Sequence, residues 1–150
     1  MWIRTLIVAA LAATATPAIA ADWWLIAESG ERPARNFFFA DRDSVRRTGP
    51  NQVEVQGRFY QEAPADNIAA RSTLFRLSCD GRTSLILTGD SRDRSGAVVE
   101  RFDFADVPQE PNPIVPGSAF ESLLEFSCDG AQGVSQAGAD PDALVRRLFD

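Results

Sequence analysis

The stretch QVEVQGRFY, residues 52–60, decides the fold of this 150-residue chain. Val53, Val55, Gly57 and Phe59 alternate with polar residues and Tyr60. Successive side chains of a β-strand point to opposite faces, so the alternation predicts a strand with one buried face. We expect the face that carries Arg58 to be exposed to solvent.

Five further short segments have the composition of strands and are bounded by turn residues. They span residues 22–27, 36–40, 73–79, 83–90 and 98–104. The short spacing between them predicts about six antiparallel strands joined by turns. Between the predicted strands at 36–40 and 52–60, residues 41–49 leave room for only one helical turn or a tight loop.

A helix is predicted after a segment with four prolines, residues 107–117, which cannot form a central strand. Ser118 and Glu121 have the spacing of a capping box, in which each side chain bonds a backbone amide of the first turn. The apolar residues Phe120, Leu123 and Leu124, with Cys128, then recur on one helical face. The predicted fold class is therefore α+β, an antiparallel sheet with a C-terminal helix packed on one face.

Cys79 and Cys128 are the two cysteines of the chain, and each precedes Asp-Gly within a similar eight-residue segment. The flanking residues predict a strand for the first copy and a helix for the second, so we interpret the similarity as shared turn chemistry. We predict a disulfide between the two cysteines, because paired cysteines in an exported chain are oxidised. It would tether the helix to the sheet and close a loop of about 50 residues, worth roughly 4 kcal/mol in the chain-entropy model. A redox role is the alternative, but no C-x-x-C motif lowers a thiol pKa.

Residues 1–20 have the pattern of a cleavable signal peptide: Arg4, an uncharged run and an Ala-x-Ala site that ends at Ala20. A membrane anchor is the alternative, but Pro17 breaks the uncharged run. We expect a protein exported to the periplasm or cell surface of a bacterium. It would have no transmembrane anchor after cleavage and no lipid anchor, since no cysteine lies near the site.

The exported chain is long enough for one core, and we divide it into a domain at 21–130 and a tail at 131–150. Residues 131–139 are small and polar, which predicts a flexible segment. Asp140-Pro141 begins a possible short helix that carries Leu144, Val145 and Leu148. So short a helix needs a surface on which to dock.

Composition argues against catalysis. The chain has no histidine, its 15 basic residues are all arginine, and its net charge is −6. The usual general base, the commonest metal ligand and the Schiff-base amine are therefore missing, and nucleic acid is a poor partner. We predict no enzyme activity, no cofactor and no metal.

Two sets of residues leave alternatives open. Asp41 with Asp43, or Asp103 with Asp106, have the chemistry of a carboxylate pair, but we interpret them as solvated turn residues, and residues 41–44 match only half a calcium loop. The aromatic residues Trp23, Trp24 and 37–39 suit either a binding face or a core.

Several segments in order resemble the surface-adhesin E-like family of bacterial envelope proteins. They are WLIAES at 24–29, FADRDSVRRTG at 39–49, a strand entering Cys79, Gly96 before the sixth strand, and IVPGS at 114–118 leading a helix into Cys128. The resemblance covers roughly residues 22–129. It implies the same sheet with a tethered helix.

In function, the resemblance implies a non-enzymatic protein that binds host extracellular-matrix or serum proteins. A periplasmic structural or inhibitory module that binds an envelope protein is the second reading. Neither reading assigns ligand-binding residues.

Overall fold

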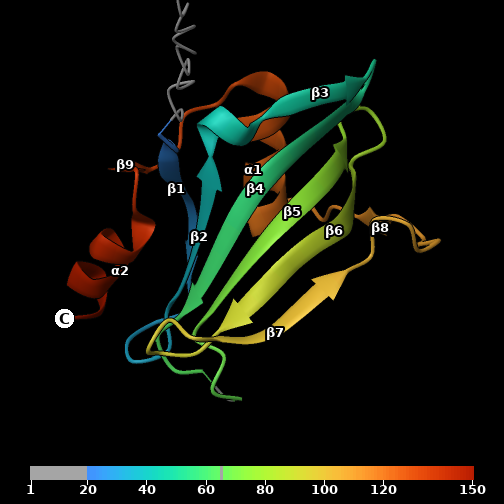
Figure 1. Ribbon diagram of the computed structural model, residues 1–150. Coiled ribbons are helices and arrows are strands. Elements are labelled where there is room, and N and C mark those ends of the chain that lie inside the picture. Colours follow the sequence, from blue (N-terminus) through green and yellow to red (C-terminus); the bar gives the residue numbers. More distant parts are fainter. Residues whose placement is uncertain (1–19, 65) are drawn as a thin grey trace, which may run out of the picture.

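The computed structural model describes residues 20–64 and 66–150, so the predicted signal peptide lies, apart from Ala20, outside the described residues. The described chain forms one antiparallel sheet in the order β7-β6-β5-β4-β2-β1-β9, with β3 beside β4 and β8 beside β6 (Figure 1). The strands are β1 Trp23–Ser29, β2 Asn36–Asp41, β3 Arg46–Gly49, β4 Gln52–Gln61, β5 Ala70–Ser78, β6 Thr83–Arg92, β7 Val98–Asp103, β8 Asn112–Pro113 and β9 Ser135–Gly138.

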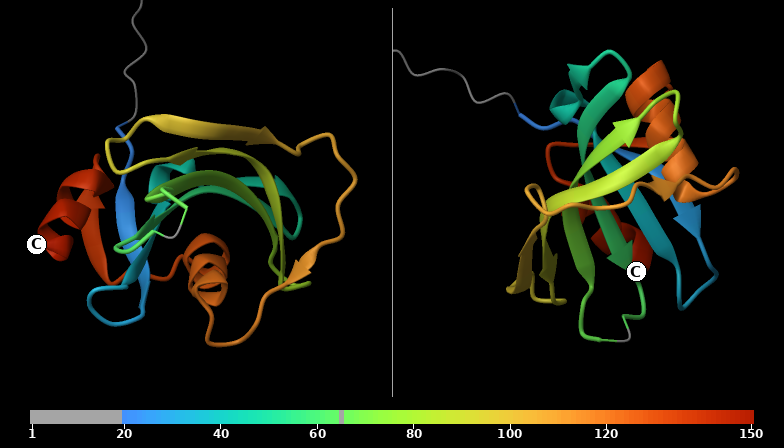
Figure 2. Two further views of the ribbon diagram at one scale, coloured as in Figure 1. Left: turned by 90° about the horizontal axis from the view of Figure 1, so that it is seen from below. Right: turned by 90° about the vertical axis from the view of Figure 1, so that its right-hand side faces the viewer.

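Helical segments cover the two faces of this sheet. A 3-10 turn, η1 (Arg42–Ser44), separates β2 from β3, and α1 (Ala119–Leu124) continues into a π-helical turn, η2 (Glu125–Asp129). The last element is α2 (Pro141–Phe149). The sheet curves around α1, whereas α2 lies on the other side, next to β1 (Figure 2). We call these two sides the α1 face and the α2 face.

The six predicted strands are confirmed, but the sheet is larger than predicted because β9 extends it beside β1 and two strand positions are occupied in two pieces. The first part of β4 pairs with β3 and the second part with β2. In the gap left by η1, the Ser44 Oγ accepts the Gln56 N–H at 2.8 Å. At the other edge, β6 pairs first with β8 and then with β7. β3 has four residues and β8 only two, and strands this short leave little pattern in the sequence. Neither strand was therefore predicted.

The segment 131–150 differs from its prediction as a flexible tail. β9 pairs antiparallel with β1, and the Val134 N–H donates to the Leu25 carbonyl at 2.7 Å. The predicted short helix is present as α2 and has the surface that it needs, because Val145 is buried against β1 and β2. Backbone pairing, to which small polar residues contribute as well as large ones, explains why composition alone gave the wrong prediction.

The three consecutive phenylalanines of β2 bury both faces of the sheet. Phe38 points into the core of the α1 face, and Phe37 and Phe39 point into the core of the α2 face. Their alternation follows from the strand period of two. These three phenylalanines therefore form core, which agrees with the sequence interpretation of core rather than of a binding face.

Gly57 of β4 leaves the space that the Phe38 ring occupies. A Cβ atom at Gly57 would lie 2.9 Å from Phe38 Cε2 and 2.8 Å from Phe75 Cε2. The Phe38 and Phe75 rings are 6.1 Å apart and nearly perpendicular, and both contact the ring of Phe120 in α1. A glycine is thus required here by close approach rather than by backbone conformation.

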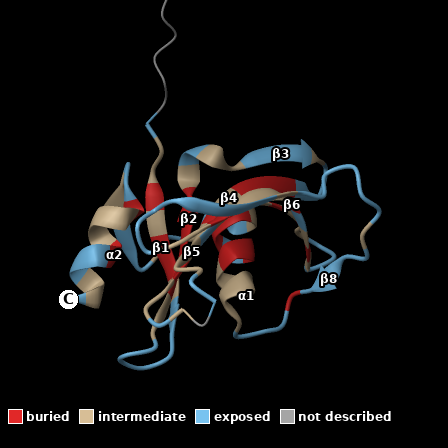
Figure 3. Ribbon diagram, turned by 60° about the horizontal axis from the view of Figure 1, so that its bottom comes forward, coloured by how far each residue is buried: buried red, intermediate tan, exposed pale blue. Residues whose placement is uncertain are grey.

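The start of α1 follows the predicted capping box with one change. The Ser118 Oγ accepts the Glu121 N–H at 3.3 Å, as expected. The Glu121 carboxylate, however, accepts the N–H of Gly117 at 2.7 Å, one residue before the predicted cap. Leu123 and Leu124 are then buried against the sheet. Figure 3 shows this buried strip along α1 and β4, in contrast with the exposed β3 and β8.

Candidate functional site

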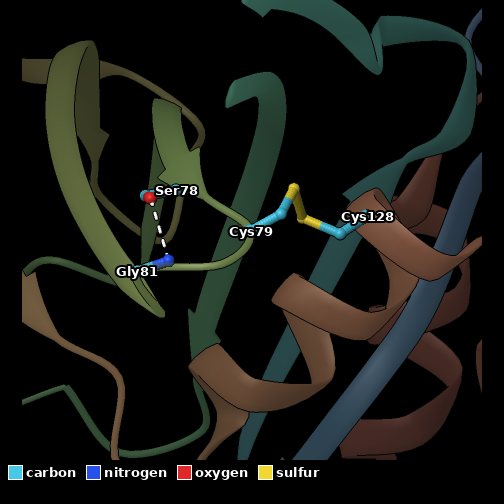
Figure 4. Close-up of a disulfide and its surroundings, with 4 residues drawn as sticks. All are labelled: Ser78, Cys79, Gly81 and Cys128. Atoms are coloured by element: carbon cyan, nitrogen blue, oxygen red, sulfur yellow. Dashed lines mark hydrogen bonds between the residues drawn. A yellow bond between two sulfur atoms is a disulfide. The ribbon is translucent and has the colours of Figure 1, made fainter. Parts of the chain in front are cut away.

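The predicted disulfide is present and joins the sheet to the α1 segment. Cys79 follows β5 and Cys128 lies in η2, with an S–S distance of 2.10 Å and a Cα–Cα distance of 5.9 Å (Figure 4). Near the strand end, the Ser78 Oγ accepts the Gly81 N–H at 3.1 Å, which closes the turn. The two similar Ser-Cys-Asp-Gly segments thus occupy a strand end and a helix end, as predicted.

Of the four aspartates considered as carboxylate pairs, Asp41 and Asp103 accept hydrogen bonds from backbone N–H groups. The Asp41 Oδ1 accepts the N–H groups of Asp22 at 2.9 Å and Asp43 at 3.1 Å, which caps η1. The Asp103 Oδ1 accepts the Ala105 N–H at 3.1 Å in the turn after β7. Among the described residues there is no group of three or more side chains suited to hold a metal ion. These aspartates are therefore not assigned to a site.

Within the described ranges, no helix has both the length and the apolar character that a membrane span requires.

On the α2 face, Arg58 is not the free surface residue that alternation predicted. Its guanidinium donates to the Ser72 Oγ at 2.9 Å and to the Asp142 Oδ1 at 3.3 Å, and it lies 4.9 Å from the centre of the Trp23 ring. The Tyr60 hydroxyl also donates to Asp142. Burial, followed by this hydrogen bond, raises the pKa of Tyr60 well above its ordinary value. Arg58 is therefore part of the contact that holds α2.

A cleft of about 300 Å³ opens beside this contact, where α2 meets the ends of β4, β5 and β6. We call it the arginine cleft, because Arg58, Arg92, Arg94 and Arg146 all line it. They come from four different elements: β4, β6, the β6–β7 turn and α2. Apolar side chains complete the lining, namely Ala69, Ala70, Val145 and Phe149.

Carboxylates also line the arginine cleft, and each is already bonded. Glu62 accepts the Arg35 Nε and Nη2 at 3.0 and 2.9 Å and the Arg35 backbone N–H at 3.0 Å. The side-chain hydrogen bond from Arg35 is the main cause that lowers the pKa of Glu62 to about 2. Asp93 accepts from its own turn, through the N–H and hydroxyl of Ser95 and the N–H of Ala97.

A second candidate surface is the strand at the opposite end of the sheet, β7. No described strand pairs with its outer side, so we call this side the β7 edge. Val98 and Val99 are 38% and 51% exposed, and Phe104, directly after the strand, is 41% exposed. Large exposed apolar side chains beside unpaired backbone are typical of surfaces that bind another chain.

Sequence reasoning did not find either surface. The arginines of the cleft are separated by up to 88 positions, and only the folding of 131–150 back onto β1 brings Arg146 to the others. The β7 edge was predicted as a strand, but its place at the end of the sheet depends on strand order. Alternating residues do not encode that order.

Comparison with known proteins gives no relative: no family model, no curated protein and no solved structure matches this chain.

Proposed function

We propose that this chain is an exported, non-enzymatic protein-binding module of the bacterial envelope, which takes an extended segment of its partner as an additional strand. The observation that carries the proposal is the β7 edge, the outer side of a six-residue strand on which no described strand pairs and beside which apolar side chains are exposed. Addition of a strand to a sheet edge is a common mode of peptide recognition, in which main-chain hydrogen bonds supply affinity.

The direction of the β7 amides supports this mode of binding. The Phe104 N–H donates to the Leu87 carbonyl of β6 at 2.6 Å. In an antiparallel pair, successive residues turn their N–H and C=O groups to opposite sides. Phe102 therefore faces β6 with its amide, whereas Arg101 turns its amide outward, where a partner strand would accept it.

The charged residues of β7 support an edge that binds some partner strands and not others. Glu100, Arg101 and Asp103 interrupt the apolar residues of the strand. Charges on an edge strand oppose indiscriminate pairing of identical sheets, so they leave the edge available to a partner of complementary sequence. The family resemblance suggests an extracellular-matrix or serum protein as that partner, and the periplasmic reading suggests an envelope protein.

Replacing Arg101 separates edge pairing from side-chain effects. Arg101→Pro removes the outward amide but no hydrogen bond to β6, whereas Arg101→Ala removes the same side chain and keeps the amide. Binding of both variants to a panel of immobilised matrix, serum and envelope proteins is measured by a surface biosensor. We expect Arg101→Pro to weaken a partner's binding at least about tenfold relative to Arg101→Ala, with unchanged melting temperature. Equal binding by the two variants would reject edge pairing.

The location of the protein distinguishes the two partner classes. Protease treatment of intact cells degrades a displayed adhesin and leaves a periplasmic protein uncut until the outer membrane is opened. We expect a shorter mature chain that begins near Ala21 in either case, because the signal peptide is removed on export.

A further inference from the structure

The arginine cleft holds two cations whose charges no carboxylate in the described part of the chain balances. Arg58 contacts Asp142, and Arg92 contacts Asp90 at 2.7 Å. Arg94 donates only to a backbone carbonyl, that of Glu62, at 2.8 Å. The Arg146 guanidinium forms no hydrogen bond or ion pair with any described residue, whereas its backbone carbonyl accepts the Asp150 N–H.

The acidic groups that line the cleft do not cancel its positive charge, because the lining holds four arginines and three carboxylates. Glu62 is bonded to Arg35, Asp93 to its own turn, and Asp142 to Tyr60 and Arg58. The chain as a whole carries a net charge of −6, so the region around the guanidinium groups of Arg94 and Arg146 differs from the rest in being locally positive. Such a region attracts an anion despite the overall charge, because the field within a cleft is set by the nearest groups.

The apolar part of the lining limits the kind of anion. Val145 is buried, and the ring of Phe149 lies 5.4 Å from that of Phe37, tilted by 41° to it. Ala69 and Ala70 add a wall without polar side-chain atoms. A volume of about 300 Å³ is at the small end of ligand pockets. The lining therefore suits a small group with one charged end and one apolar side.

We propose that the arginine cleft binds an organic carboxylate with an apolar body, with Arg94 and Arg146 on the carboxylate and Val145 and Phe149 against the body. The planar guanidinium group matches a carboxylate in a bidentate geometry. Two sources present this chemistry: a free small acid, and the C-terminal residue of a protein. This site is separate from the β7 edge and does not depend on the function proposed for it.

The probe for the test is N-acetyl-phenylalanine, with N-acetyl-phenylalanine amide as the uncharged match and inorganic phosphate as an anion without an apolar body. Binding to the mature chain is followed by NMR titration of the backbone amides of α2 and the β6–β7 turn. We expect the acid to bind at least about tenfold more tightly than the amide and than phosphate. Equal affinity for acid and amide, or for acid and phosphate, would overturn the proposal.

Two arginines on the same helix provide the matched variants. Arg146 and Arg147 are both exposed, but only Arg146 lines the cleft. Arg146→Gln and Arg94→Gln should each weaken binding of the acid at least about tenfold, and Arg147→Gln, which changes the net charge equally, by less than about twofold. A loss of the same size in Arg146→Gln and Arg147→Gln would mean that net charge alone attracts the probe, and the site would be rejected.

Tripeptides that end in phenylalanine, with a free or an amidated C-terminus, identify the source. If the free-carboxylate peptide binds as well as the acid, the site accepts the end of a protein chain. If it binds at least about tenfold more weakly while the acid still binds, the site is one for small acids. The Arg101→Pro variant should bind the acid normally, so failure of this site and failure of the β7 edge are distinguishable.

Discussion

On the α1 face the covering helix is joined to the sheet by a covalent bond, whereas on the α2 face the covering helix is held by noncovalent contacts alone. The α1 segment buries Leu123, Leu124 and Phe126 almost completely and carries Cys128. From α2, only Val145 and Pro141 are buried, and Leu144, Leu148 and Phe149 are partly buried. Its other attachments are polar.

The polar attachments of α2 lie at its two ends. Asp142 in the first turn accepts from Tyr60 and Arg58. Near the last turn, the Leu148 carbonyl accepts from Arg35 and, at 3.2 Å, from Arg32. Regions with few buried apolar contacts open at lower free energy than the rest of a domain. The difference between the faces therefore predicts a stable α1 face and an α2 face that opens first.

The largest expected effect is on the α1 face. Leu124→Ala should lower the free energy of unfolding by about 2–5 kcal/mol, because it leaves a cavity among residues that are 0–3% exposed. The check is chemical denaturation with the disulfide intact. A change below about 0.5 kcal/mol, the size usual for surface positions, would show that α1 is not packed as described.

A smaller effect is expected for the matching change on the α2 face. Val145→Ala removes two buried methyl groups, which corresponds to roughly 1.5 kcal/mol from transfer out of water. Hydrogen exchange measures where this loss occurs: we expect faster exchange in α2 and β9 and unchanged exchange in α1. Equal acceleration in both helices would mean that the two faces unfold as one unit, and the comparison would fail.

The smallest expected effect is a change of the free energy of unfolding with pH that arises on the α2 face. The pKa of Glu62 is about 2 in the folded chain, against an ordinary value of 4.5, mainly because of the hydrogen bond from Arg35. A folded pKa below the unfolded one contributes stability that is present above about pH 4.5 and is lost as the pH falls toward 2. Wild type should therefore lose its stability advantage over Glu62→Gln in this interval.

Thermal unfolding of both proteins between about pH 2 and pH 7 measures this effect. Parallel curves over the whole range would show that the Arg35–Glu62 contact does not form in solution. Because Arg35 also donates to Leu148, the same titration should loosen the end of α2 before it affects α1.

The α1 face could be predicted from sequence far better than the α2 face, for physical reasons. Strand alternation at 52–60, the capping residues Ser118 and Glu121, and the two cysteines are local signals, and the strand, the helix start and the disulfide that they predict are all present. The α2 face depends on β9, whose small residues pair through the backbone, and on Asp142, which is 82 positions from Tyr60. Such contacts leave no periodic pattern, so Arg58 was misplaced on a free surface and the arginine cleft was missed.

The contact of Phe38 with Gly57 has a consequence for how the strands find their partners. If β2 slipped by one residue against β4, each face would still receive aromatic side chains, because three phenylalanines stand in a row. Burial of apolar area alone thus distinguishes poorly between the correct pairing and its nearest error. Ala40 lies directly opposite Gly57, where the Phe75 ring already fills part of the space. A slip by one residue would replace Ala40 there with the large ring of Phe39 or the charged side chain of Asp41. The two small residues that face each other, Ala40 and Gly57, therefore fix the register between β2 and β4 where the phenylalanines alone do not.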